Sequence, residues 1–201
     1  MTPRLILLDV GKVLIDFDFR IAVKNLQKLF PVDMFKVVRL FKTSSLADDW
    51  DKGLISPEQF FRQVQKEMGL PIDMDRFASI WNGIFTEKPE MIALAQSLNQ
   101  NYKVFLLSNT NPWHAEYLRK NFPWTTRFDG FIASCEVRLL KPDPEIYRLA
   151  LKKAGAAAEE TFYIDDMSEN VRAAKKLGMG VHLFSGHPAL LADLRKKNLV
   201  G

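Results

Sequence analysis

Four short polar stretches of the chain carry side chains whose chemistry could combine in one site. Asp9 follows a short apolar run, Ser108-Asn109-Thr110 ends a second apolar run, and the pair Asp165-Asp166 ends a third. Lys141 stands just before a predicted helix. Because ligands of open parallel sheets bind beyond the carboxyl ends of the strands, we expect all four stretches on one rim. One site would then contain a carboxylate nucleophile, hydroxyl and amide groups, a cation and an acidic pair.

Taken singly, each stretch also has an ordinary structural explanation. Asp9 can be a turn residue, and Ser108-Asn109-Thr110 can be a polar loop before the next helix. Lys141 is harder to explain in this way, because a cation ahead of a helix N-terminus opposes the helix dipole. Asp165 and Asp166 could favour the N-terminus of a helix, but adjacent carboxylates repel each other unless a cation is present. The four stretches together favour a shared ligand.

The elements that would hold these residues alternate along the chain. Short apolar runs predict five buried strands, over residues 4–9, 103–108, 130–134, 161–165 and 180–184. Helical spacing and capping residues predict helices over residues 88–100, 143–155 and 168–178. Strands that are apolar throughout are typical of parallel sheets covered on both faces. The sequence therefore predicts an α/β fold with a Rossmann-like parallel sheet.

Residues 19–87 break this alternation, because they show helical patterns only. Helices are expected over residues 20–30, 33–44, 56–69 and 73–85. The third of these begins with a capping box from Ser56 to Gln59 and has Pro57 in its first turn. We therefore expect an α/β core made of residues 1–18 and 88–201, with residues 19–87 inserted as a helical cap.

The composition of the chain argues against several other classes of protein. The net charge is +4, but the Lys and Arg residues form no basic stripe interleaved with aromatic residues, so nucleic-acid binding is not expected. No apolar stretch approaches the ~18 residues of a transmembrane helix, and the first apolar run stops at Asp9, unlike a secretory signal. The one cysteine, Cys135, excludes an internal disulfide and fits a reducing compartment. We expect a cytoplasmic protein without a membrane partner; the sequence does not set its oligomeric state.

The order of four motifs resembles that of one hydrolase family. "LILLDVGKVL" at residues 5–14, "VFLLSNT" at 104–110, "LLKPDPEIY" at 139–147 and "TFYIDDMSENVRAAKKLGM" at 161–179 follow one another as in the haloacid dehalogenase-like (HAD) hydrolase superfamily. Members of that superfamily are mostly Mg²⁺-dependent phosphatases, and the helical insertion is similar to their helical cap. The first motif, together with "SNTNPWH" from residue 108, looks similar to bacterial sugar-phosphate phosphatases of the glucose-1-phosphate phosphatase type.

The resemblance implies catalytic and substrate-binding roles. Asp9 matches the nucleophile that takes up the phosphoryl group as an aspartyl-phosphate. Ser108 and Asn109 match phosphate-binding positions, and Lys141 matches the lysine that offsets charge on the nucleophile and the phosphoryl oxygens. The charges agree with these roles, because a phosphate dianion approaches a carboxylate only where cations offset the repulsion.

The resemblance also implies a Mg²⁺ site. Asp166, together with Asp165, matches the acidic ligands of the metal. The remaining protein ligands would be Asp9 and the backbone carbonyl of Gly11.

Gly11 departs from the pattern of the family. Many of its phosphatases carry an aspartate two residues after the nucleophile, where it protonates the leaving group and then activates water, and a general acid typically contributes about 10²–10⁴ in rate. Asp16, Asp18 and His114 are the substitutes that motif position offers, although turn and capping roles explain all three more simply. Lys12 could help to hold an anionic substrate.

The cap contains one acidic segment, "ADDWDKG" at residues 47–53, which is expected to join two cap helices and to face the core. Three aspartates beside one lysine disfavour a multiply phosphorylated substrate, whereas carboxylates bind hydroxyl groups well. The segment therefore indicates a small monophosphate with a neutral, hydroxylated leaving group. A solvated loop between helices explains the same residues.

The leading hypothesis is a Mg²⁺-dependent phosphatase that hydrolyses a small phosphomonoester, such as a sugar phosphate, through an aspartyl-phosphate on Asp9. One alternative is a catalytically weak or inactive HAD-fold protein with a binding or regulatory role, which only Gly11 favours. The other is a 2-haloacid dehalogenase in which Asp9 attacks carbon. Asp165 and Asp166 disfavour that reaction, because it needs no metal.

Overall fold

A computed structural model describes residues 2–33, 35–36, 39–40 and 45–201. Its centre is a parallel sheet with the strand order β5-β4-β1-β6-β7. The strands are β1 (Leu5–Leu8), β4 (Lys103–Ser108), β5 (Gly130–Ala133), β6 (Thr161–Asp165) and β7 (Gly180–Leu183). In the middle strand, Leu8 lies opposite Leu106 of β4 and Ile164 of β6. The carboxyl ends of these three strands are therefore neighbours, and the predicted α/β fold is confirmed.

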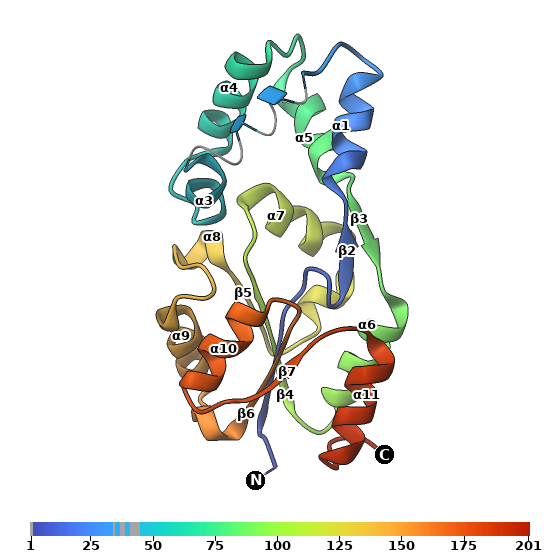
Figure 1. Cartoon of the computed structure of the whole chain (residues 1–201), viewed down its shortest axis with the longest axis vertical. Helices are drawn as coiled ribbons and strands as arrows, with labels where there is room; N and C mark the ends of the chain where they lie inside the picture. The colour runs from blue at the N-terminus through green and yellow to red at the C-terminus, as the bar shows by residue number, and fades with distance from the viewer. Residues whose placement is uncertain (1, 34, 37–38, 41–44) are drawn as a thin grey trace.

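Helices cover both faces of this sheet (Figure 1). They are α6 (Pro89–Leu98) and α11 (His187–Lys196) on one face, and α9 (Pro144–Ala154) and α10 (Ser168–Lys176) on the other. Along β1, Ile6 and Leu8 pack in the cluster of the first pair, while Leu5 and Leu7 pack in the cluster of the second. Side chains of a strand point alternately to its two faces, so a strand buried on both faces is apolar throughout. None of the described helices is long and apolar enough to cross a membrane.

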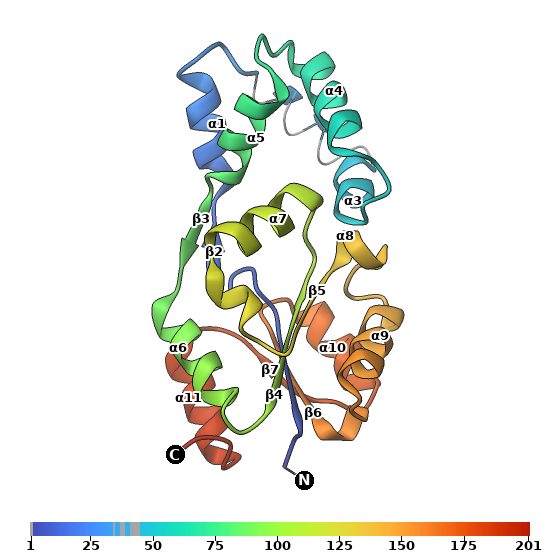
Figure 2. The same ribbon diagram turned by 180° about the vertical axis from the view of Figure 1, so that it is seen from behind.

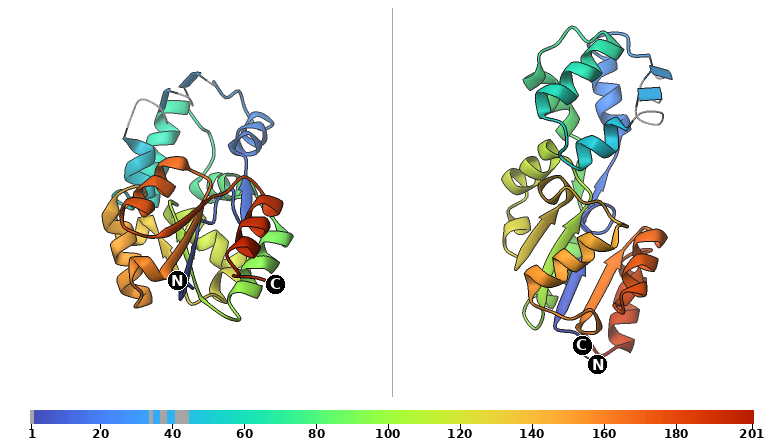
Figure 3. Two further views of the ribbon diagram at one scale, coloured as in Figure 1. Left: turned by 60° about the horizontal axis from the view of Figure 1, so that its bottom comes forward. Right: turned by 90° about the vertical axis from the view of Figure 1, so that its left-hand side faces the viewer.

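A group of helices stands above the carboxyl ends of the strands, at the end of the molecule opposite the two termini (Figure 3). It contains α1 (Phe19–Gln27), α3 (Leu46–Asp51), α4 (Pro57–Met68) and α5 (Met74–Asn82). The predicted capping box of α4 is present. The helix predicted over residues 33–44 falls largely on positions outside the described residues.

The acidic segment at residues 47–53 is not the loop that the sequence predicted. Most of it belongs to α3, in which Leu46 and Trp50 are both buried. These two apolar residues are spaced by four, so they lie on one face of a helix and can pack together against the other helices of this group. The prediction rested on the run of charged residues and did not use the spacing of Leu46 and Trp50.

Two further strands were not predicted. β2 (Ile15–Phe17) and β3 (Phe85–Glu87) pair antiparallel and carry the chain between the sheet and the upper helices (Figure 2). The helix predicted to reach residue 85 ends at Asn82. A local pattern cannot reveal this pairing, because its partners are far apart in the sequence. The domain limits at residues 18–19 and 87–88 stay a prediction.

One side chain from the lower half joins the core of the upper helices. Trp113, on α7 (Pro112–Asn121), belongs to the same apolar cluster as Trp50, Phe60 and Phe77. Its ring centroid lies 5.3 Å from that of Trp50 and 5.7 Å from that of Phe60. Figure 2 shows α7 between the sheet and the upper helices. Aromatic packing therefore fixes the upper helices above the strand ends.

Candidate active site

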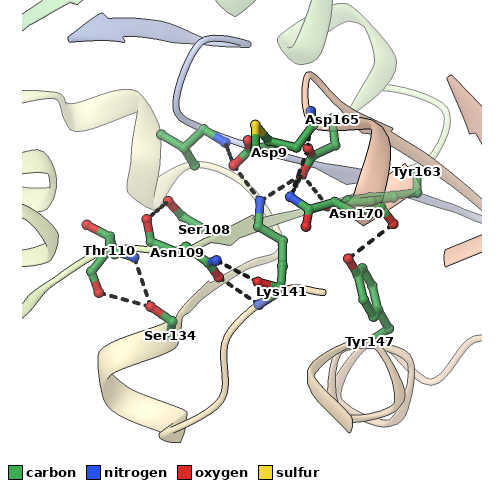
Figure 4. A network of polar contacts seen from close by, with 12 residues as sticks. Asp9, Ser108, Asn109, Thr110, Ser134, Lys141, Tyr147, Tyr163, Asp165 and Asn170 are labelled. Atoms are coloured by element: carbon green, nitrogen blue, oxygen red, sulfur yellow. Dashed lines mark hydrogen bonds and ion pairs between the residues drawn. The ribbon is translucent and has the colours of Figure 1, made fainter. Parts of the chain in front are cut away.

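The carboxyl ends of β1 and β6 bring two acidic side chains around one lysine (Figure 4). Lys141 Nζ lies 2.7 Å from Asp9 Oδ1 and 2.8 Å from Asp165 Oδ2. The three side chains are only 2%, 9% and 0% exposed in that order. Lys141 comes from the loop before α9, so the convergence depends on parallel strands that end at the same edge. The sequence prediction that these groups meet is confirmed by this geometry.

Burial and mutual charge shift the ionisation of this group. Burial raises the pKa of Asp9 to about 7; Lys141 works against this shift and Asp165 adds to it. Burial alone would lower the pKa of Lys141, but the two carboxylates outweigh it and hold that pKa above its usual value. A charged lysine is thus maintained beside the nucleophile candidate.

Asp9 is held through one oxygen atom. Oδ1 accepts hydrogen bonds from the Val10 backbone N–H at 2.7 Å and from Lys141. Both bonds orient the carboxylate, and Oδ2 receives neither of them. An oriented carboxylate with one oxygen left for attack fits a nucleophile.

The hydrogen bonds of Asp165 change the role expected of it. Oδ1 accepts from the Met167 backbone at 2.7 Å and from Asn170 Nδ2 at 3.0 Å, while Oδ2 accepts from Lys141 and from the Tyr163 hydroxyl. Both oxygens are therefore satisfied by protein donors, and Asp165 is fully buried. Its geometry suits the positioning of Lys141 better than direct contact with a metal.

Asp166 is the more accessible member of the acidic pair. It is half-buried, and its pKa is raised, chiefly by burial and then by Asp165. Oxygen atoms of Asp9, Asp165 and Asp166 all lie within 4.8 Å of one another. Three carboxylates beside one lysine leave an excess of negative charge, and carboxylate oxygens are the ligands that Mg²⁺ prefers. The donor set therefore fits a magnesium ion.

The two predicted phosphate-binding residues lie at the end of β4. Ser108 is buried, with its side chain at the same rim as Asp9. Asn109 exchanges two hydrogen bonds with the Lys141 backbone: Asn109 Nδ2 donates to the Lys141 carbonyl at 2.9 Å, and Asn109 Oδ1 accepts from its N–H at 2.8 Å. The Asn109 amide therefore fixes the loop that carries the lysine.

Two neighbouring cavities open at this rim. We call one the acidic cavity; it is lined by Asp9, Gly11, Lys12, Phe17, Ser108, Asn109, Lys141, Asp166, Met167, Glu169 and Asn170. We call the other the aromatic cavity; it is lined by Val10, Gly11, Ile15, Phe17, Phe19, Asp51, Phe85, Ser108, Asn109, Thr110, Asn111, His114 and Leu118. They share Gly11, Phe17, Ser108 and Asn109, so the two cavities lie side by side.

The three substitutes proposed for a general acid occupy different places. Asp16 lies 3.4 Å from both Lys12 Nζ and Lys88 Nζ, and Asp18 caps α1 and pairs with Arg20. Neither aspartate lines either cavity. His114 lines the aromatic cavity, where burial lowers its pKa to about 4. The imidazole is therefore neutral near pH 7.

Two residues that support the site were missed by the sequence prediction: Tyr163 and Asn170. Tyr163 and Asp165 are two residues apart on β6, a spacing that places them on the same face of the strand. Asn170 lies in the first turn of α10, just after the end of β6, and donates to both oxygens of Asp165. Asp51 belongs to the acidic segment that was expected to face the core, and it does line the aromatic cavity.

A family model described as haloacid dehalogenase-like hydrolase matches residues 3–178. The chain is 28% identical over 180 residues to the D-ribitol-5-phosphate phosphatase of Bacteroides thetaiotaomicron, a match that covers 86% of this chain and 87% of the relative. It is 30% identical over 158 residues to the sesquiterpene phosphatase astK of Aspergillus oryzae, with 77% and 79% covered.

Solved structures with this fold include a HAD family enzyme of Bacteroides thetaiotaomicron in complex with magnesium and inorganic phosphate. The TM-score is 0.82 at 30% identity, and the match covers 92% of this chain and 96% of the other. An L-2-haloacid dehalogenase of Xanthobacter autotrophicus matches with a TM-score of 0.64 at 20% identity, covering 99% of this chain and 85% of the other. At that identity the similarity concerns the fold alone.

Proposed function

The chain belongs to the haloacid dehalogenase-like hydrolase family, and from this membership we propose that it is a Mg²⁺-dependent phosphatase of small phosphomonoesters. The relatives named as phosphatases and the related structure with magnesium and inorganic phosphate support this function. The observation that carries it in this chain is the arrangement of Lys141 between Asp9 and Asp165, with Asp166 alongside. This arrangement provides a nucleophile, a fixed cation and a metal-binding carboxylate at one rim.

In the proposed reaction, the phosphoryl group lies in the acidic cavity. Asp9 Oδ2 attacks phosphorus while the ester oxygen departs with its bonding electrons and takes a proton from water, which gives an aspartyl-phosphate and the free alcohol. Water then hydrolyses the aspartyl-phosphate, releasing inorganic phosphate and restoring Asp9. Lys141 offsets the negative charge between the carboxylate and the phosphoryl oxygens in both steps.

The metal ligands in this proposal are Asp9, Asp166 and the backbone carbonyl of Gly11. Asp165 was predicted as a further ligand. In this proposal it accepts a hydrogen bond from Lys141 through Oδ2 and from the Met167 backbone through Oδ1, and it adds negative charge near the metal. When bound, Mg²⁺ supplies positive charge that lets a phosphate dianion approach the nucleophile and stabilises the transition state. Ser108 and the backbone around Asn109 hold the remaining phosphoryl oxygens.

Two other functions are less well supported. A 2-haloacid dehalogenase would have no use for the half-buried Asp166 beside Asp9. An inactive binding protein is disfavoured by the intact hydrogen bonds that orient Asp9 and Lys141. We propose a cytoplasmic enzyme whose partner is a small phosphate ester, with no role for nucleic acid or membranes.

Phosphate release from a panel of sugar phosphates, polyol phosphates and nucleotides, measured with Mg²⁺ and with EDTA, tests this function. We expect turnover of at least one small monoester, lost with EDTA and restored by added Mg²⁺. Turnover that is indifferent to EDTA, or none on any ester of the panel, would contradict the proposal. Chloride release from 2-chloropropionate in the same buffer tests the dehalogenase alternative, and we expect none.

A further inference from the structure

The aromatic cavity lies where the alcohol part of a phosphomonoester would extend if its phosphoryl group occupied the acidic cavity. The two cavities meet at Gly11, Phe17, Ser108 and Asn109. Gly11 is the position at which the aspartate of many related phosphatases would stand, and here the Phe17 ring occupies the space of that side chain between the two cavities. The inference below rests on the proposed phosphatase function, since it assigns the chemistry of the leaving group.

Asp51, from the upper helices, is fixed at this cavity by contacts with the core. Ser134 Oγ donates to the Asp51 carbonyl at 2.6 Å and accepts from the Thr110 backbone N–H at 2.8 Å. Gly53 lies against the Cys135 carbonyl so closely that a Cβ there would come within 2.2 Å of the oxygen. The C-terminal end of α3 therefore rests on α8 (Ser134–Val137), as Figure 1 shows.

Asp51 is partly buried, and its carboxyl group has few polar partners. Burial raises its pKa to about 6, and the hydrogen bond from the Asn111 amide offsets only part of the effect. Asp51 forms no ion pair with any described residue. A carboxylate in this state gains most from a bound group that donates hydrogen bonds to it.

His114 lines the same cavity and carries no charge near pH 7. Asn111 Oδ1 accepts from the His114 backbone N–H at 3.0 Å, so Asn111 Nδ2 is the donor to His114 Nδ1 at 2.9 Å. A neutral imidazole that accepts at Nδ1 carries its proton on Nε2. Nε2 is itself buried, so it does not face the open space of the cavity, and the Trp81 backbone interacts with the imidazole. The His114 ring therefore forms an uncharged wall that Asn111 holds in place.

The remaining lining is aromatic and uncharged. Phe85 meets the His114 ring edge-on, with centroids 4.9 Å apart, and Phe19 lies 6.0 Å from it. No lysine or arginine of the described residues lines this cavity. A second phosphate or a carboxylate on the leaving group would therefore be desolvated without a counter-charge. Aromatic rings do suit the C–H faces of a carbohydrate or polyol chain.

We propose that the aromatic cavity binds an uncharged, polyhydroxylated leaving group, a sugar or polyol, whose hydroxyl groups donate to Asp51. Specificity for the alcohol is then set by this residue of the upper helices, which Asn111 of the core holds in place. The acidic segment containing Asp51 acts through this one side chain; Asp48, on the same helix, is exposed and does not line the cavity.

A matched set of five-carbon esters tests this assignment: ribitol 5-phosphate, n-pentyl phosphate, 5-aminopentyl phosphate and pentane-1,5-diyl bisphosphate. We expect kcat/KM for ribitol 5-phosphate to exceed that for n-pentyl phosphate by about 10- to 100-fold, because the buried polar groups stay unpaired with the alkyl chain. Asp51→Asn should reduce this ratio by about 10-fold, because it removes the charge that strengthens the hydrogen bond from the hydroxyl group. Asp48→Asn removes the same charge from the same helix and should leave the ratio unchanged.

The outcomes separate this inference from the function on which it rests. If neither these esters nor p-nitrophenyl phosphate is hydrolysed with Mg²⁺, the phosphatase function fails. If p-nitrophenyl phosphate is hydrolysed but n-pentyl phosphate equals or exceeds ribitol 5-phosphate, the function stands and the polyol assignment is overturned. A preference for 5-aminopentyl phosphate would mean that the cavity binds a cation. A preference for pentane-1,5-diyl bisphosphate would mean that a cation binds the second phosphate, although no described lysine or arginine lines the cavity. Either result would also overturn the polyol assignment.

Discussion

The ring of Phe17 occupies the space into which a side chain at residue 11 would project. A Cβ at Gly11 would lie 2.9 Å from Phe17 Cε1, closer than such contacts allow. Phe17 belongs to β2 and is held there by Phe19, with ring centroids 5.7 Å apart, and by Lys12, whose Nζ lies 4.6 Å from the ring centroid. The space that a side chain at residue 11 would need is thus filled by the Phe17 ring, which lines both cavities.

Gly11→Ala should therefore displace Phe17. We expect a loss of about 1–3 kcal/mol in the free energy of unfolding, the usual cost of overpacking, together with a higher KM. Urea unfolding and steady-state kinetics measure the two effects. Gly11→Ala combined with Phe17→Leu should be more stable than the sum of the single changes predicts. Strict additivity would show that the two residues do not compete for one space.

Asp9→Asn should abolish turnover without unfolding the protein. The amide oxygen can still accept from Val10 and Lys141, but it cannot attack phosphorus, so we expect kcat to fall by about 10⁴-fold or more. Phosphate release and the melting temperature are the measurements. Asp75→Asn, an exposed aspartate on α5, serves as the control and should keep full activity. Turnover by Asp9→Asn within tenfold of the wild type would remove Asp9 from the nucleophile role.

Lys141→Met should destabilise the fold as well as stop catalysis. It leaves the carboxylates of Asp9 and Asp165 buried without their cation, which costs about 3–5 kcal/mol of unfolding free energy. Asp165→Asn in the same chain should recover part of that loss, because it removes one of the unpaired charges. Lys120→Met, on the exposed side of α7, is the control and should change stability by less than about 0.5 kcal/mol. Equal losses in both lysine variants would contradict the buried ion pair.

The buried His114 should make stability depend on pH. Its pKa is lowered from 6.5 to about 4 by burial, so the unfolded chain binds the proton more readily, and the contribution present above pH 6.5 is lost as the pH falls toward 4. Between pH 7 and pH 4.5 the wild type should lose about 2 kcal/mol more unfolding free energy than His114→Gln. Urea unfolding at the two pH values measures the difference. Parallel pH dependence of the two proteins would show that this imidazole is not neutral and buried in the fold.

The sequence by itself determined the parts of this protein that depend on local pattern. Apolar runs that end in polar residues located the strands of the sheet, and capping residues located helices such as α4. The strand ends then indicated Asp9, Ser108 and Asp165 as neighbours, because parallel strands present their carboxyl ends at one edge. Family resemblance added the roles of these residues.

Only the tertiary structure decided what depends on contacts between distant segments. The pairing of β2 with β3 places Phe17 over Gly11, and no periodicity in either segment encodes that contact. The same holds for Asp51, which reaches the aromatic cavity because α3 packs on α8. Residue spacing does not reveal hydrogen bonds, and only the structure shows that protein donors already satisfy both carboxylate oxygens of Asp165. The sequence carries the identities of the reacting groups, whereas three-dimensional packing sets the space, the solvation and the partners that each of them has.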